Sequence, residues 1–292
     1  MQLSNFALLA GVLGAAAHPS GHAHLHRSAK REAPAFVKAI HNKPLIPTTT
    51  QQASAASSSA APATTAAAVS ANTQSSESSE YIAFCGSSSK AKRVTYDQIM
   101  YKGNTGTSNG CTWNSNLMVV PNSIAKKYKY IQEYTNVASE PYQVVCANKM
   151  GADGQLTGMF KVAGQNPLIF TLQPGETKTV VADDNTQGVC AFAPNEVPTT
   201  THGQYAGVWA EFDFANASNG GWSGADCSSL VAQAYNMDVP GCRMSEGGVD
   251  STILPGGHGT NAYTKGMEAL DGIGLNIVPG STTIKVFVGF SG

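Results

Sequence analysis

All six cysteines of this chain lie beyond residue 84, and their confinement to that part restricts the fold more than any other feature. They are Cys85, Cys111, Cys146, Cys190, Cys227 and Cys242. An even number of cysteines in the globular part of a secreted chain predicts disulfides, up to three of them in fifteen possible pairings. The cysteines form no CxxC pair and have no zinc-type spacing to histidine, so we expect no metal and no other cofactor.

The N-terminus has the pattern of a secretory signal peptide over residues 1–17. An apolar core around Leu8 and Leu13 precedes three alanines, and we expect cleavage after Ala17. This run is too short to cross a bilayer, and no later segment has about 18 unbroken apolar residues, so we expect no membrane span. The sequence therefore predicts a secreted protein, located in the extracellular space or the cell wall.

Residues 18–31 have the features of a propeptide. The segment contains four histidines and ends in the pair Lys30 and Arg31, followed by Glu-Ala. This arrangement resembles a fungal dibasic processing site, where cleavage would remove all four histidines. An alternative is a copper site at His18, which becomes the N-terminal residue after signal cleavage.

Residues 32–80 are predicted to be a disordered linker. From Thr48 onward the segment is almost only Ser, Thr, Ala and Gln, so it cannot bury enough apolar surface to offset the entropy of ordering. Its Ser/Thr density is also typical of an O-glycosylated stalk. The net charge of −1 provides no electrostatic basis for binding nucleic acid or an anionic membrane.

Residues 81–292 are predicted to form one mainly β domain. Short strands separated by turn signals, with one or two short helices, indicate a disulfide-stabilised β-sandwich. The predicted helix is Thr260–Leu270, with apolar residues near one face and Gly272 beyond its end. The predicted strands are Lys129–Thr135, Tyr142–Asn148, Leu168–Leu172, Thr177–Ala182, Val189–Phe192, Val208–Phe214 and Thr282–Phe290.

The strand Val208–Phe214 carries the strongest candidate site. Its apolar residues alternate with Trp209, Glu211 and Asp213, which therefore share one face. This face has three possible roles: a solvated surface that guards the sheet edge, a sugar-binding surface on which Trp209 stacks, or a pair of catalytic carboxyl groups. Just beyond it, Asn216-Ala217-Ser218 matches the N-glycosylation motif, with Asn216 as the acceptor.

Several longer segments resemble a known family of secreted fungal allergens, typified by the Aspergillus allergen Asp f four. They are TYDQIMYKGNTG, PNSIAKKYKYIQEY, GADGQLTG, PGETKTVVADDNTQGVCAFA and VWAEFDF with GWSGADCSS. The resemblance runs from about Tyr96 to the C-terminus. It implies IgE as a binding partner and brings no established activity.

A second resemblance, to thaumatin-like proteins, concerns the same strand. The segments WAEF, ADCS, AYNM and IKVF, with LQPGETKTV upstream, are similar to motifs of that family. The resemblance implies a β-sandwich with an acidic cleft that binds β-1,3-glucan. The cleft glutamate would correspond to Glu211 and a cleft aspartate to Asp226, whereas the cleft arginine has no visible counterpart and the cysteines are fewer.

Two functions follow from these resemblances. The first is a non-enzymatic protein of the cell wall or extracellular matrix that binds β-glucan through Trp209, Glu211, Asp213 and Asp226. The alternative is a β-1,3-glucan hydrolase that uses Glu211 together with Asp226 or Asp213.

The segment DCSSLVAQAY supports a third hypothesis. It resembles the nucleophile segment of NlpC/P60 cysteine peptidases, in which the cysteine begins a helix whose dipole lowers the pKa of the thiol. Cys227 would then be the nucleophile and His258 the base. The competing interpretation is that Cys227 is a structural half-cystine, which the even cysteine count favours.

Overall fold

The computed structural model of the protein describes residues 80–85, 103–107 and 110–292. The signal peptide, the propeptide and nearly all of the linker lie outside the described residues, and so do their processing residues Ala17, Lys30 and Arg31. Within the part of the chain that is described, no helix is long and apolar enough to cross a membrane.

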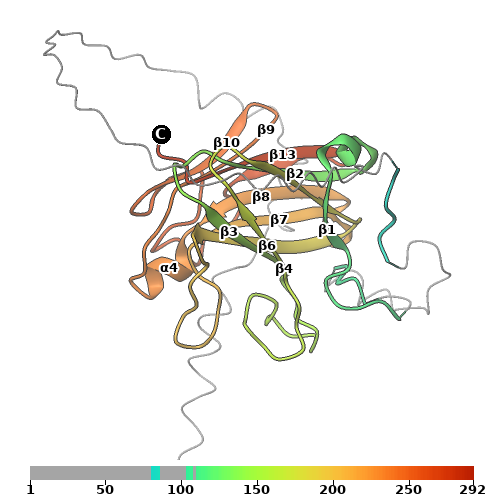
Figure 1. Ribbon diagram of the computed structural model, residues 1–292, viewed down its shortest axis with the longest axis horizontal. Helices are drawn as coiled ribbons and strands as arrows, with labels where there is room; N and C mark the ends of the chain where they lie inside the picture. Colours follow the sequence, from blue (N-terminus) through green and yellow to red (C-terminus); the bar gives the residue numbers. More distant parts are fainter. Residues whose placement is uncertain (1–79, 86–102, 108–109) are drawn as a thin grey trace, which may run out of the picture.

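The described chain forms two β-sheets that stack face to face as the layers of a sandwich (Figure 1). The strands of the first sheet are, in spatial order, β1 (Leu117–Val120), β5 (Thr177–Ala182), β2 (Tyr130–Asn136), β13 (Thr282–Val288), β9 (Cys242–Glu246), β10 (Val249–Leu254) and β11 (His258–Thr260). Those of the second sheet are β12 (Leu275–Ile277), β8 (Trp222–Ser228), β7 (Val208–Asn216), β6 (Thr186–Pro194), β3 (Tyr142–Asn148) and β4 (Leu168–Leu172). The predicted mainly β, disulfide-stabilised sandwich is confirmed.

The main core lies between the sheets and follows from the alternation of apolar residues along the strands. From β7, Phe212 and Phe214 point inward, and from β13 come Ile284, Val286 and Val288. Each of these side chains is at most 1% exposed. Because burying one such side chain contributes about 1.5–3 kcal/mol, the two inner faces together supply the dominant stabilising term.

The C-terminal strand β13 closes the first sheet by a pairing that its sequence does not reveal. It lies between β2 and β9, parallel to β2 and antiparallel to β9. Since β2 comes near the beginning of the described domain, the parallel pairing brings the two ends of the domain into one sheet. The sandwich is therefore complete only when the whole domain has folded.

All seven predicted strands are present, and three of them, β3, β4 and β5, have the predicted bounds. The predicted helix Thr260–Leu270 is wrong. Its residues form turns, and Gly266 has a φ of 90°, which an α-helix does not accommodate. Tyr263 instead makes backbone hydrogen bonds with Cys227 and Ser229, so this segment extends the second sheet.

The helices in the described residues are short. They are α4 (Leu230–Ala234) and two 3-10 turns, η4 (Asn122–Lys127) and η5 (Ala217–Asn219).

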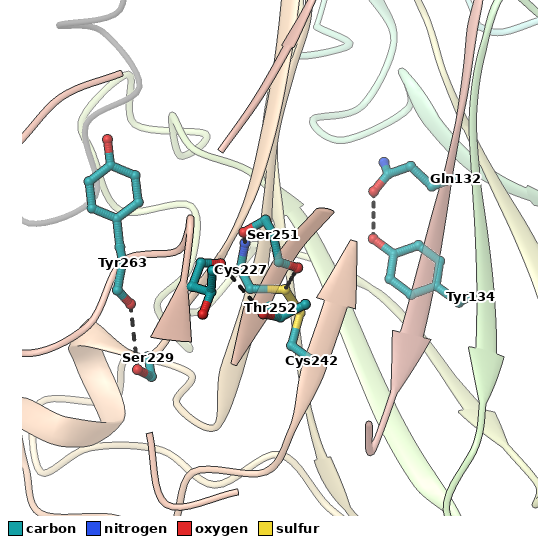
Figure 2. Close-up of a disulfide and its surroundings, with 9 residues drawn as sticks. Gln132, Tyr134, Cys227, Ser229, Cys242, Ser251, Thr252 and Tyr263 are labelled. Atoms are coloured by element: carbon teal, nitrogen blue, oxygen red, sulfur yellow. Dashed lines mark hydrogen bonds between the residues drawn. A yellow bond between two sulfur atoms is a disulfide. The ribbon is translucent and has the colours of Figure 1, made fainter. Parts of the chain in front are cut away.

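The six cysteines form three disulfides. Cys85–Cys111 holds the segment that enters the domain, and Cys146–Cys190 joins directly opposite residues of β3 and β6. The third disulfide, Cys227–Cys242, runs from β8 to β9 and so links the two sheets (Figure 2). A hydroxyl from β10 supports it, because the backbone N–H of Cys227 donates to Ser251 Oγ at 2.9 Å.

We predict that replacing both members of the inter-sheet disulfide, Cys227→Ala with Cys242→Ala, lowers the free energy of unfolding by about 3 kcal/mol. The disulfide closes a loop with a sequence separation of 15 residues, and the chain-entropy relation assigns about this stabilisation to such a loop. Urea unfolding followed by tryptophan fluorescence measures the change. An unchanged unfolding midpoint would contradict the prediction.

Candidate functional site

The candidate site lies on the outer face of the second sheet, where β7 and β8 run side by side. The alternation along these strands turns Glu211 and Asp213 of β7 and Asp226 of β8 to the side opposite the main core. Glu211 lies directly opposite Asp226, and Asp213 lies opposite Gly224. We call Glu211, Asp213 and Asp226 the acidic cluster. The pairing brings together the three carboxylates that the sequence singled out.

The acidic cluster is buried, which the interpretation of a solvated strand face did not anticipate. Glu211 is 4% exposed, Asp213 5% and Asp226 3%. The physical reason is a second apolar layer on this outer face, to which Trp113, Met159 and Tyr205 contribute from connecting segments. These segments fold over the face and exclude water from it.

Trp209 belongs to that apolar layer and not to a sugar-stacking surface. Its side chain is 2% exposed, and its indole Nε1 donates to the carbonyl oxygen of Tyr205 at 3.0 Å. The expectation that Trp209 stacks on a sugar therefore does not hold in this structure. Its place on the face is as predicted, but the covering segments seal it.

One lysine, Lys149, which sequence reasoning missed, faces the three carboxylates. It directly follows β3, and its backbone N–H donates to the carbonyl oxygen of Gln187 at 2.9 Å. The side chain is only 9% exposed, and the charges of all three cluster carboxylates act on its ammonium group. Alternation along β3 would have placed Lys149 on an outer face, but its neighbours became visible only in the folded structure.

Burial shifts the pKa of every charged group in the site toward the neutral form. It raises the pKa of Asp213 to about 7, against the opposing effects of the Asn216 hydrogen bond and the Lys149 charge. It lowers the pKa of Lys149 to about 8, although the carboxylates oppose this shift.

The pKa values of Glu211 and Asp226, which lie directly opposite each other, shift in the same direction as that of Asp213. Burial raises the pKa of Glu211, partly offset by Lys149 and by a hydrogen bond from Ser228. The pKa of Asp226 lies well above its usual value because of burial and the nearby charge of Glu211. Near neutral pH the site therefore mixes protonated and ionised groups, which can both donate and accept hydrogen bonds.

Four polar atoms of the site have no hydrogen-bond partner among the described residues. They are Asp213 Oδ1, Asp226 Oδ1, Lys149 Nζ and Tyr263 Oη. Leaving a buried polar group unpaired costs about 1–3 kcal/mol, more for a charged group. Groups of this kind ordinarily bind ordered water or a polar ligand. The concentration of such groups around one acidic cluster marks it as the candidate binding site.

A β-bulge at the end of β7 holds Asp213 from the other side. The register between β7 and β8 shifts between Asp213 and Asn216, and Ala215 there has a φ of 48°. The amide nitrogen of Asn216 donates to Asp213 Oδ2. Asn216 is also the predicted glycosylation acceptor, and it is only 3% exposed. The glycosylation site stays a prediction.

The cysteine peptidase hypothesis is wrong, because Cys227 has no free thiol. Its sulfur is bonded to Cys242, and the residue lies within β8 rather than at the start of a helix. The only part of the motif that becomes helical is α4, which begins at Leu230. The predicted base, His258, lies on the exposed edge strand β11.

The described residues contain no group of three His, Cys, Asp or Glu side chains arranged to hold a metal ion. The alternative copper site at His18 lies outside the described residues. The charged groups that could instead contact a ligand are those of the acidic cluster and Lys149.

The fold and the site define a disulfide-stabilised β-sandwich with a buried charged cluster on one outer face. Residues 115–288 match the Allergen Asp f 4-like domain, and the chain belongs to this family. It is 38% identical over 194 residues to Allergen Asp f 4 of Aspergillus fumigatus. This match covers 64% of the chain and 58% of the relative, less than two thirds of the relative's length.

Two solved structures are similar to this chain at a low level. One is the protein elicitor MoHrip2 from Magnaporthe oryzae, with 13% identity, a TM-score of 0.34, and coverage of 55% of this chain and 99% of the other. The second is the thaumatin-like xylanase inhibitor TLXI, with 12% identity, a TM-score of 0.32, and coverage of 54% and 97%.

We predict that the stability of the protein falls as the pH rises from about 4 to about 7, and that Asp213→Asn removes part of this fall. The pKa of Asp213 is raised from 3.8 to about 7, so in this range the folded protein holds a proton that the unfolded chain has lost. Each pKa unit corresponds to about 1.4 kcal/mol, so the full effect is about 4 kcal/mol.

Thermal unfolding at several pH values measures this effect. The matched control is Glu196→Gln, which neutralises an exposed carboxylate on a loop. Wild type and Asp213→Asn with the same pH dependence of Tm would show that the buried carboxyl group does not titrate as expected.

Proposed function

We propose that this protein is a secreted, non-enzymatic component of the cell wall or extracellular matrix that binds β-1,3-glucan. The binding groups are those of the acidic cluster and Lys149. The observation that carries the proposal is the set of buried polar atoms without partners around Glu211, from β7, β8, the residue after β3 and the segment of Tyr263.

The chemistry of the site suits a neutral, hydroxyl-rich ligand. Sugar hydroxyl groups both donate and accept hydrogen bonds, and so they can pair with unprotonated carboxylate oxygens and with the Lys149 ammonium at the same time. An anionic ligand would meet three carboxyl groups. The choice of β-1,3-glucan among neutral glycans rests on the resemblance of the Glu211 strand to thaumatin-like proteins.

Binding explains the arrangement better than hydrolysis by Glu211 with Asp226 or Asp213. Opposite residues on antiparallel strands have Cβ atoms about 4.5–5.5 Å apart, a separation compatible with a retaining glycosidase. A hydrolase, however, must place a glycosidic bond between its two carboxyl groups. Glu211 and Asp226 lie side by side on one sheet and are each at most 4% exposed, whereas a binding protein needs only that hydroxyl groups reach them.

Secretion is consistent with the three disulfides and with the allergen family. Attachment to the wall would follow from glucan binding, because the glucan is itself a wall polymer.

We predict that the wild-type protein sediments with insoluble β-1,3-glucan and that Glu211→Gln weakens this binding by about tenfold or more. The substitution keeps the shape of the side chain but replaces a carboxyl oxygen with an amide nitrogen, which cannot accept a hydrogen bond, a loss of about 1–3 kcal/mol. The control Glu133→Gln changes a half-buried carboxylate on β2, in the other sheet. Thermal unfolding of each variant verifies that it is folded.

The same samples are assayed for released reducing sugar. Binding without sugar release supports the proposal, whereas sugar release that disappears in Glu211→Gln would establish the hydrolase instead. Absence of wild-type binding, or equal binding by the Glu211 and Glu133 variants, would refute glucan binding at this site.

We also propose that IgE binds this protein, because its relative from Aspergillus fumigatus is named an allergen. We expect sera that contain IgE against that relative to bind the folded protein in an immunoassay, and the purified protein to compete for that IgE. Failure to compete at any protein concentration would refute this part of the proposal.

A further inference from the structure

The surroundings of the acidic cluster are buried on three sides. Toward the start of β7 lies the apolar layer, with Trp209 and Tyr205 both at most 8% exposed. Toward β3 lies Lys149, and beside Asp226 lies Tyr263, which is 7% exposed and whose raised pKa reflects burial and the Asp226 charge. None of these three sides offers a path along which a polymer could continue.

The fourth side is more accessible, and its residues come from the same sheet face. Alternation along β8 places Trp222 and Gly224 on the face of Asp226, and both are half-buried. Gln187, opposite Asp213, is also half-buried, and Asn276 of β12, opposite Gly224, is exposed. A ligand that reaches the acidic cluster therefore approaches over Gly224.

Gly224 has no side chain to stand over the face beside Asp213 and Asp226, although a Cβ atom there would be in close contact with the backbone of β12. A Cβ atom there would have a single neighbour within 4 Å, the carbonyl oxygen of Leu275 at 3.3 Å. By contrast, a Cβ at Gly188 on the inner face would lie 2.5 Å from the ring of Phe212. The absence of a side chain at Gly224 leaves the surface next to Asp213 and Asp226 uncovered. The absence of a side chain at Gly188 instead makes room for the Phe212 ring in the core.

The half-buried Trp222 lies two residues from Gly224 on this accessible side. An indole has a broad apolar face, which suits the apolar face of a sugar ring, and its edge remains polar. Trp222 lies at the accessible end of the face and Trp209 at the sealed end, so Trp222 is the tryptophan that an incoming ligand would meet.

From this geometry we propose that the site binds the terminal unit of a neutral glycan chain, which enters over Gly224 with Trp222 against its ring. This inference rests on the proposed glucan binding and narrows it. With three sides closed, an internal stretch of polymer has an entry but no exit, whereas a chain end needs only the entry. The acidic cluster, Lys149 and Tyr263 then pair with the hydroxyl groups of that last unit.

The test compares two ligands of the same sugar by isothermal titration calorimetry on the full-length protein. One is a linear β-1,3-gluco-oligosaccharide, and the other is a cyclic β-1,3/1,6-glucan, which has no chain end. We expect the linear ligand to bind at least about tenfold more tightly, a difference of about 1.4 kcal/mol. Equal affinities would overturn chain-end binding but leave glucan binding by the Glu211 site intact.

Variants test the route of entry. Gly224→Val places a β-branched side chain on the accessible side and should abolish binding of the linear ligand, while the smaller Gly224→Ala should weaken it less. Trp222→Ala should reduce affinity about tenfold, and Trp222→Phe should retain most of it. Thermal unfolding establishes that each variant is folded.

Full binding by a folded Gly224→Val protein would refute entry over Gly224. If that variant does not fold, the comparison of linear and cyclic ligands on wild type still decides whether the site binds a chain end. Should neither soluble ligand nor insoluble glucan bind the wild type, the proposed function and this inference both fall.

Discussion

The structure depends on the burial of β7 on both of its faces. On the inner face, Phe212 and Phe214 pack against the first sheet, and this contact forms the centre of the sandwich. On the outer face, Trp209 joins an apolar layer that the connecting segments build. Because Glu211 and Asp213 share that outer face, the same covering that completes the fold also removes two carboxylates from water.

This covering has an energetic cost that points to function. Burying charged groups is unfavourable unless they are paired and hydrogen-bonded, and a well-packed apolar residue is often as stabilising. Here three carboxyl groups face one ammonium group, and several of their polar atoms remain without partners. A purely structural role would not require so many charged groups, and for this reason we regard the acidic cluster as a binding site.

The segment around Trp113, which covers part of this face, is held to the sheet by a network of buried asparagines. The side-chain amides of Asn116 and Asn148 donate to each other's carbonyl oxygens at 2.8 Å in both directions. Asn148 also donates to Asn114 Oδ1 at 3.0 Å. Since Lys149 follows Asn148 directly, the hydrogen bonds that hold the covering segment also hold the end of β3 next to Lys149, on whose ammonium group the charges of the acidic cluster act.

The sequence by itself determined the β-sandwich class, the positions of seven strands, the disulfide-bonded state of the domain and the shared face of Glu211 and Asp213. These are local properties, because a period of two along a strand says which residues lie on one side. Only the tertiary structure decided what lies over that side. Burial of the acidic cluster, the position of Lys149, the sealing of Trp209 and the loss of the expected helix at Tyr263 all depend on segments distant in the sequence. The packing of these distant segments buries charged residues that would otherwise lie in solvent. No local sequence pattern predicts this burial.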